Sequence, residues 1–496
     1  QVRYTACFPP FVTTTWSLGI AKPESRRVLA ATASRKAGKP AAGEYRWDFG
    51  SLAAVIAAST IAGGVGKSGS PAPNPITGFP SARNWFALLV MARVADGSTA
   101  AARFEMAWRS VTGLLSCGLS FRHPRDPCMA PEISIPPHLL PSDGRFGSGP
   151  SRVPQASLDA IAAAGSYMGT SHRKPTVKDV VARVRHGLAE LHDLPDGHEV
   201  ILGVGGATAF WDIAAFSLID RRSAHFVCGE FSSKFAAVTS GAPHLEIPVV
   251  ISSEPGTAPP PQAVDGVDAA AFIHNETSTG VMAPFERFDD ELVLVDGTSA
   301  AGAVSFDARD VDAYYFSPQK ALGSEGGLWI AFLSAAAIDR AQAIAASDRW
   351  IPPFLSLTTA IENSRKDQTY NTPALATLLF LDLQVSAVHD LGGLPAAAAV
   401  SRASAEHLYA WAEASAFAEP FVTNLAHRSP TVATIDFDDM VDANEVAAVL
   451  RANGIVDTES YRKLGRNQLR IAAFPTIPTA DVEALTACID YVVSEM

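Results

Sequence analysis

Short apolar runs alternate with segments of helical period between about residues 176 and 390. Near-continuous apolar runs separated by helices are typical of strands buried on both faces of a mostly parallel sheet. The pattern therefore predicts an α/β fold. Functional residues are expected directly after the apolar runs, because such sheets bind ligands at the carboxyl ends of their strands. The predicted strands are 199–205, 224–229, 245–252, 269–275, 292–297, 312–317 and 328–333, and the first helices are 177–194 and 207–219.

A different pattern follows toward the C-terminus. A long linking helix is predicted over 374–390, and beyond it strands and helices are mixed, which predicts a small α+β domain. The later helices are predicted at 392–414, 441–454 and 479–496, and the strands at 431–437 and 468–474. We assign residues 129–385 to a large domain and 386–496 to the small domain.

The first 128 residues differ from the rest in charge and in pattern. They hold 15 Lys and Arg against 6 Asp and Glu, which leaves 24 against 45 of the chain's 39 and 51 for residues 129–496. No apolar period persists, so we expect a mostly irregular or disordered extension. A transit peptide and an additional domain are alternatives. We favour upstream sequence attached to an enzyme that begins at Met129, and we assign residues 1–128 no catalytic role.

Charge and cysteine content limit the class of partner. An acidic body argues against nucleic acid, so an anionic ligand must be bound by locally placed arginines. The apolar run 51–62 has about half of the ~20 residues that a membrane span needs, so no membrane partner is expected. The five cysteines have neither zinc-site nor disulfide-framework spacing. Together these features predict a soluble, cytoplasmic protein without a metal site.

Polar residues stand directly after several of the predicted strands. A Gly-Gly turn at 205–206 opens a helix, and a helix N-terminus suits a phosphate. Asp296, Thr277 and Lys320, which is the one lysine in the stretch 314–329, follow three other strands. Each feature alone is common, because glycine turns pack helices on strands and polar residues often end strands. The combination of an anion-binding turn, a carboxylate and a lysine is much less common.

This combination matches the needs of pyridoxal 5′-phosphate. That cofactor requires a lysine to hold it as a Schiff base, a carboxylate to keep its ring nitrogen protonated, an anion site for its phosphate and an apolar face. Lys320, Asp296, the Gly206–Ala207 turn and Phe231 can supply these in that order. A lysine placed after an apolar strand also loses its proton easily, which favours its use as a nucleophile.

Nine motifs in unbroken order, over roughly residues 138–496, resemble phosphoserine aminotransferases of the actinobacterial type. They are GRFGSGPS (144–151), GTSHR (169–173), GGATAFWD (205–212), GEFSSKF (229–235), HNETSTG (274–280), VDGTS (295–299), FSPQK (316–320), QTYNTP (368–373) and RKLGRNQLRIAAFP (462–475). The resemblance implies fold type I of the pyridoxal-phosphate enzymes, with a mostly parallel, seven-stranded type of sheet in the large domain. It also implies a homodimer with shared active sites.

The resemblance implies an activity as well. An amino group would pass between L-glutamate and 3-phosphohydroxypyruvate, giving O-phospho-L-serine and 2-oxoglutarate, in serine biosynthesis and in many bacteria also in pyridoxine biosynthesis. Lys320 would hold the cofactor and move the proton, and Asp296 would pair with the ring nitrogen. The other cofactor contacts implied are Phe231 on the ring face, Thr277 near the ring oxygen, Gly206, Ala207 and Gln319 on the phosphate, and Asn371 and Thr372 on the partner subunit's cofactor.

The substrate's anionic groups require arginines, whose forked donors match carboxylates and phosphates. By resemblance, Arg470 takes the α-carboxylate, and His172 with Arg173 takes the second anionic group. Arg462 and Lys463 are possible helpers from the small domain. The alternative for all five is ordinary surface charge.

Two residues depart from the sequence pattern of the family, and three alternative functions stay open. Many family members have an arginine at the position of Ala207, and Val204 stands in the turn where a polar residue is expected. An alanine–glyoxylate type of aminotransferase, a cysteine desulfurase and a non-catalytic phosphate-ligand binding homologue are the alternatives. Poorly placed cysteines argue against the second, and the Lys320–Asp296 pair argues against the third.

Overall fold

The computed structural model describes residues 2–8, 12–18, 31–35 and 133–496. The first three ranges form an antiparallel sheet of β1 (Val2–Phe8), β2 (Val12–Leu18) and β3 (Ala31–Arg35). The apolar pattern did not predict these strands. The rest of the extension, including the run 51–62 and Met129, lies outside the described residues. For these residues the expected irregular or disordered structure stays a prediction.

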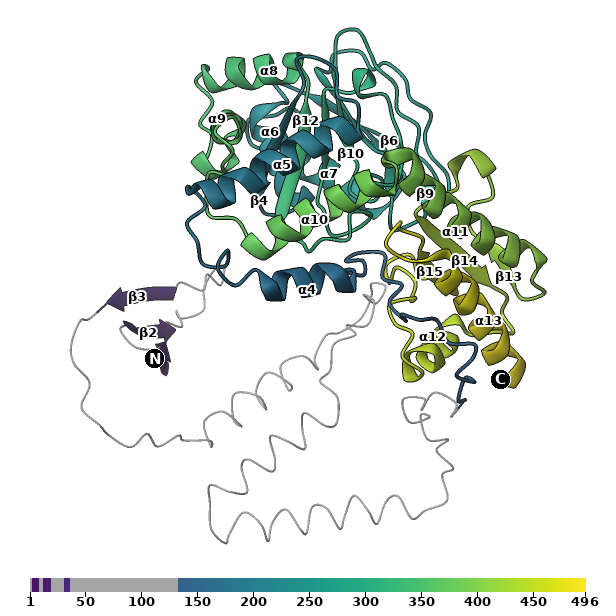
Figure 1. Cartoon of the computed structure of the whole chain (residues 1–496). Helices are drawn as coiled ribbons and strands as arrows, with labels where there is room; N and C mark the ends of the chain where they lie inside the picture. The colour runs from purple at the N-terminus through teal and green to yellow at the C-terminus, as the bar shows by residue number, and fades with distance from the viewer. Residues whose placement is uncertain (1, 9–11, 19–30, 36–132) are drawn as a thin grey trace, which may run out of the picture. The chain divides into compact units, whose positions relative to one another are not determined.

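A seven-stranded sheet forms the centre of the large domain (Figure 1). Its order is β4-β12-β11-β10-β7-β5-β6, and the prediction of a mostly parallel sheet is confirmed. Only β12 runs antiparallel, to both β11 and β4. The strands are β4 (Glu199–Val204), β5 (Ser223–Val227), β6 (Val249–Ser252), β7 (Ala269–Ile273), β10 (Leu292–Asp296), β11 (Ala313–Phe316) and β12 (Leu328–Leu333).

Helices cover both faces of this sheet (Figure 1). On one face α5 (Pro175–Leu191) packs beside α10 (Leu375–Leu391), and α4 (Gln155–Ala163) contacts α10. The valines and leucines of α5 recur at helical spacing and are buried on the sheet, which explains why the segment forms a helix there. The opposite face carries α6 (Ala207–Ser217), α7 (Glu230–Gly241), α8 (Ala335–Ala345) and α9 (Leu357–Ser364).

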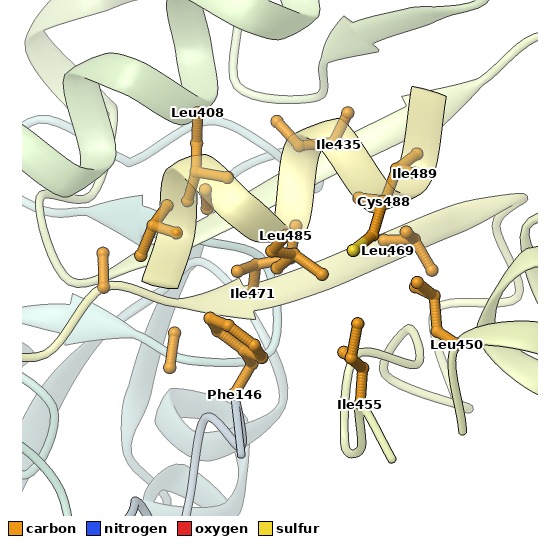
Figure 2. Packing of buried hydrophobic residues seen from close by; sticks show 14 of the residues in the cluster. Phe146, Leu408, Ile435, Leu450, Ile455, Leu469, Ile471, Leu485, Cys488 and Ile489 are labelled. Carbon is orange, nitrogen blue, oxygen red and sulfur yellow. The ribbon is translucent and has the colours of Figure 1, made fainter. Parts of the chain in front are cut away.

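The C-terminal part has its own core. A three-stranded antiparallel sheet of β13 (Ala418–Pro420), β14 (Val432–Phe437) and β15 (Gln468–Ala472) packs against α11 (Leu394–Ala414), α12 (Ala443–Ala452) and α13 (Thr479–Glu495). Leu469, Ile471 and Leu485 meet in this core (Figure 2). Phe146 joins it from the start of the described body, so residues before α4 pack on the C-terminal core. The exact domain limits stay predictions.

Short elements complete the described part of the chain. They are the ribbon of β8 (Asn275–Glu276) and β9 (Val281–Met282) and the single turns η1 (Ala308–Asp310), η2 (Pro353–Leu355) and η3 (Leu425–His427). Within the described ranges, no single helix is long and apolar enough to cross a membrane; α10 and α11 pass that test only as a pair bent by 88°. The same ranges contain no group of three or more His, Cys, Asp or Glu side chains that could hold a metal ion.

Candidate active site

The carboxyl ends of β7, β10 and β11 meet at one edge of the sheet. Asp296, the last residue of β10, pairs in register with Ile273, the last residue of β7, and with Tyr315 of β11. Thr277 follows β7 through the short β8, and Lys320 comes four residues after the end of β11. The strand register thus brings together three side chains that are far apart in the sequence, at the edge where parallel sheets bind ligands.

Lys320 is buried, with 7% of its surface exposed. Its Nζ donates a hydrogen bond of 2.6 Å to Thr277 Oγ1 and lies 5.4 Å from the centre of the Phe231 ring. Burial lowers the pKa of Lys320 to about 8, although the negative charge of Asp296 opposes this shift. A substantial fraction of the amine is therefore uncharged near that pH, as a nucleophilic lysine requires.

A glycine makes room for this lysine. A Cβ on Gly149 would lie 2.8 Å from Lys320 Cε, and Gly149 has a φ of +152°. Both the close approach and the backbone conformation favour glycine here. The motif GRFGSGPS, which lies far from Lys320 in the sequence, therefore belongs to the same site.

Asp296 is held by two hydrogen bonds. Trp211 Nε1 donates to Oδ2 at 3.1 Å, and the Thr298 backbone N–H donates to Oδ1 at 2.9 Å. Burial raises the pKa of Asp296, while hydrogen bonding by Thr298, the charge of Lys320 and the Trp211 hydrogen bond lower it. The carboxylate therefore has a fixed orientation and an environment that accepts an additional cationic partner.

Replacement of Trp211 by Phe should separate this hydrogen bond from packing. Phe can retain the stacking on Phe235, whose ring centre is 6.2 Å away, but it cannot donate to Asp296. Turnover of the amino-group transfer that the sequence resemblance implies should fall about tenfold, because a hydrogen bond to a charged group contributes about 1.5 kcal/mol. The matched control is Trp411→Phe, which removes an indole donor to Asp490 in the small domain. Equal turnover of the two variants in steady-state kinetics would contradict this role of Trp211.

The N-terminus of α6 offers a site for an anion. Gly206 is its N-cap, and no side chain of the described chain caps it. Ser317 Oγ lies 3.8 Å from the position of a Cβ on Gly206, and it is hydrogen-bonded to Gln319. The Ala209 N–H donates to the Gly206 carbonyl at 2.9 Å, so the N–H groups of Ala207 and Thr208, with the Ser317 hydroxyl close by, are the donors suited to a phosphate. Val204 pairs with Leu328 at the end of β4, where it continues the sheet.

Arg470 brings positive charge to the site from β15. Its Nη1 donates to the Thr277 carbonyl at 3.2 Å, and its Cζ lies 5.4 Å from the centre of the Tyr461 ring. Within residues 133–496 its Nε has no hydrogen-bond partner, although that atom is buried. Burial lowers the pKa of Arg470, but a guanidinium stays charged. A partly buried cation with an unused, buried donor is suited to a carboxylate ligand.

His172 and Arg173 form a second polar cluster with the loop before α10. His172 Nδ1 and Thr372 Oγ1 are 3.1 Å apart, and Arg173 Nη1 donates to Gln368 Oε1 at 3.2 Å. Asn371 lies in this loop and lines a small cavity with Val204 and Trp329. His172 Nε2 is buried without a partner in the described chain. No hydrogen bond or ring contact in the described ranges joins this cluster to Lys320.

The two proposed helper residues differ in their contacts. Lys463 forms an ion pair with Glu230 at the start of α7, next to Phe231. This pairing raises the pKa of Lys463. Arg462 is exposed on the same loop.

Comparison with known proteins identifies the family. The model of the class-V aminotransferases matches residues 146–458. The chain belongs to the class-V aminotransferase family. Phosphoserine aminotransferase of Nocardioides sp. is 58% identical over 374 residues, which are 74% of this chain and 100% of that protein. The Rhodococcus jostii phosphoserine aminotransferase is 54% identical over 366 residues, 73% of this chain and 98% of that one.

Solved structures of aminotransferases share the fold. Phosphoserine aminotransferase of Cytophaga hutchinsonii superposes with a TM-score of 0.64 at 22% identity, over 70% of this chain and 99% of that one. An alanine–glyoxylate aminotransferase from Nostoc sp. gives 0.61 at 19% identity, over 73% and 98%. At such identities the likeness concerns the fold alone. The class-V aminotransferase described here is therefore a fold type I, pyridoxal-phosphate-dependent transaminase.

The described residues fit this cofactor. A lysine with a lowered pKa, a carboxylate fixed by two donors, an aromatic ring and an uncapped helix N-terminus converge at one sheet edge. When bound, pyridoxal phosphate supplies an electron sink for bonds at the substrate α-carbon. The sequence pattern missed Trp211 and Gly149, because their contacts with Asp296 and Lys320 join distant segments. The placement of Trp211 one turn into α6 was the available signal, since that helix begins at the phosphate site.

Proposed function

We propose that this class-V aminotransferase is a phosphoserine transaminase. It transfers an amino group between L-glutamate and 3-phosphohydroxypyruvate, giving O-phospho-L-serine and 2-oxoglutarate. The supporting observation is the match over the entire length of the Nocardioides phosphoserine aminotransferase at 58% identity. We further propose that the enzyme serves serine biosynthesis, as that name implies, and also pyridoxine biosynthesis.

We propose the following division of work among the site residues. Lys320 holds the cofactor and carries the proton, and Asp296 pairs with the ring nitrogen, in line with their burial and hydrogen bonds. The remaining cofactor contacts proposed are Phe231, Thr277, Gly206, Ala207 and Gln319. Arg470 binds the α-carboxylate, which its unused buried donor supports.

The second anionic group of the substrate is proposed to bind at His172 and Arg173, with Arg462 and Lys463 as helpers. Because no hydrogen bond or ring contact in the described ranges joins the His172–Arg173 cluster to Lys320, we propose that this cluster completes the site of a second copy in a homodimer. Asn371 and Thr372 would then reach the partner's cofactor. Exposed apolar side chains support an interface: Phe354 is 47% exposed and Tyr370 42%, and both line the same small cavity as Asn371.

The amino-acid composition supports a proposal for the cellular location and the binding partners of the enzyme. Cys228 and Cys488 are buried free thiols, which is usual for a reducing compartment, and we propose a cytoplasmic enzyme. Its partners are proposed to be its small-molecule substrates and a second copy, without nucleic acid or membrane.

Substrate addition to the purified yellow enzyme tests the activity. The visible band should bleach with O-phospho-L-serine and with L-glutamate. Bleaching only by other amino acids would contradict the proposed substrate but would still support pyridoxal phosphate as the cofactor.

Replacement of Arg173 by Gln should raise KM for phosphoserine about thirtyfold, because one charge-assisted hydrogen bond contributes about 2 kcal/mol. The exposed Arg309, which pairs with Asp307, gives the control Arg309→Gln. An unchanged KM in Arg173→Gln would overturn the assignment of the anion site.

A further inference from the structure

Glu276 is a carboxylate that none of the roles above uses. It lies in β8 and has 0% of its surface exposed. An ionised side chain with no contact to water is costly unless its lone pairs are hydrogen-bonded. Here they are: the two oxygens accept from Phe231 N at 3.1 Å, Ser232 N at 3.0 Å, Ser232 Oγ at 3.0 Å, Ser278 N at 3.2 Å and Ser278 Oγ at 2.6 Å.

These donors place the carboxylate at the N-terminus of α7. The N–H groups of a helix's first turn have no partner within the helix, and its positive dipole end attracts an anion. In α7, the N–H groups of Phe231 and Ser232 donate to Glu276, and that of Glu230 donates to Ser278 Oγ at 3.0 Å. A Cβ on Gly229 would lie 2.5 Å from Glu276 Cγ, so the approach requires glycine. The start of α7 is therefore fixed on all three donors, two of them by Glu276 of β8 and the third by Ser278, two residues further along the chain.

The residues beside these contacts belong to the active site. Phe231 presents its ring to Lys320 Nζ, and Thr277, the residue after Glu276, accepts the hydrogen bond of that Nζ and carries the carbonyl that binds Arg470. We propose that Glu276 is a positioning residue of the transaminase: its buried carboxylate holds Phe231 and Thr277 in fixed register on either side of Lys320. The proposal rests on cofactor binding at Lys320.

The charge of Glu276 adds an electrostatic effect to this positioning. Among the described residues, its negative charge acts to raise the pKa of Lys320 and of Arg470, and it contributes to the raised pKa of the Cys228 thiol. Within residues 133–496, Asp296 also raises the pKa of Lys320, and the positive charge of Arg470 lowers it. Removal of the Glu276 charge should therefore make a protonated nitrogen at Lys320 less stable, and its titration should move to lower pH.

A matched control separates positioning from simple helix capping. Asp268 accepts from three consecutive backbone N–H groups, those of residues 220, 221 and 222, and from Arg340. It precedes β7, at the amino end of the sheet, whereas the active site lies at the carboxyl end. Asp268→Asn thus removes a carboxylate with similar backbone contacts and no neighbour in the site.

The test compares Glu276→Gln with Asp268→Asn in the full chain. In both variants the new side-chain amide keeps one acceptor oxygen, and its NH2 group faces backbone N–H groups that need an acceptor. Both variants should therefore lose thermal stability in the absence of ligand. Only Glu276→Gln should raise the dissociation constant for pyridoxal phosphate, by about tenfold, and lower the pH midpoint of the yellow band by about one unit. These are measured by absorbance titration.

Two outcomes would overturn the inference. One is a Glu276→Gln protein that loses stability like Asp268→Asn but keeps the wild-type dissociation constant and pH midpoint.

If Glu276→Gln does not fold, Ser278→Ala provides the second test: it removes one hydrogen-bond donor to Glu276 and should weaken cofactor binding about threefold. The control Ser364→Ala, which removes a buried hydroxyl bonded to Leu202, should not. Wild-type affinity in Ser278→Ala would also overturn it, whereas a wild-type chain without a yellow band would contradict the proposed function.

Discussion

Replacing Lys320 with Ala is expected to abolish the yellow band of the cofactor-loaded transaminase and to lower turnover by at least about a thousandfold. The reason is that no other lysine among the described residues approaches Asp296 and Thr277 as Lys320 does. Absorbance spectra and single-turnover kinetics with phosphoserine give the measurement.

Stability provides the internal check on this variant. Burial of the Lys320 amine costs free energy that its one hydrogen bond to Thr277 only partly offsets, so ligand-free Lys320→Ala should melt no lower than the wild type. The exposed Lys366 gives the control Lys366→Ala, which should keep the spectrum and turnover. A normal yellow band in Lys320→Ala would remove Lys320 from the site.

Asp296→Asn is the second large effect expected, with a loss of about a hundredfold or more in turnover. The amide has nearly the same shape but cannot stabilise a proton on the ring nitrogen as a carboxylate does. It also has one acceptor oxygen for two donors, Trp211 Nε1 and Thr298 N, so one hydrogen bond is lost. Steady-state kinetics at saturating cofactor measure the loss.

The ligand-free Asp296→Asn protein should change little in stability, because the lost hydrogen bond and the relieved burial of charge oppose each other. The control Asp312→Asn replaces another buried carboxylate, which pairs with Arg287 at the amino end of β11. That control should lose stability and keep turnover per folded enzyme. Turnover in Asp296→Asn within threefold of that control would disprove the assignment.

Some features of the site and fold were predicted from the sequence pattern, and others were not. Asp296 and Lys320 were predicted from their places after apolar runs, and the structure sets both at the same sheet edge. The antiparallel direction of β12 was not predicted, since a buried apolar run looks alike in either direction. The pairing of Lys463 with Glu230, and of His172 with Thr372, also required the folded chain.

The sequence by itself determined the α/β class, the lysine–carboxylate pair and the family resemblance, because apolar period and strand-end residues are local properties. Only the tertiary structure decided what supports the pair. Trp211 meets Asp296 across 85 positions of sequence, and Glu276 meets Phe231 across 45. Such contacts depend on how helices pack on the sheet, and no local pattern encodes that packing.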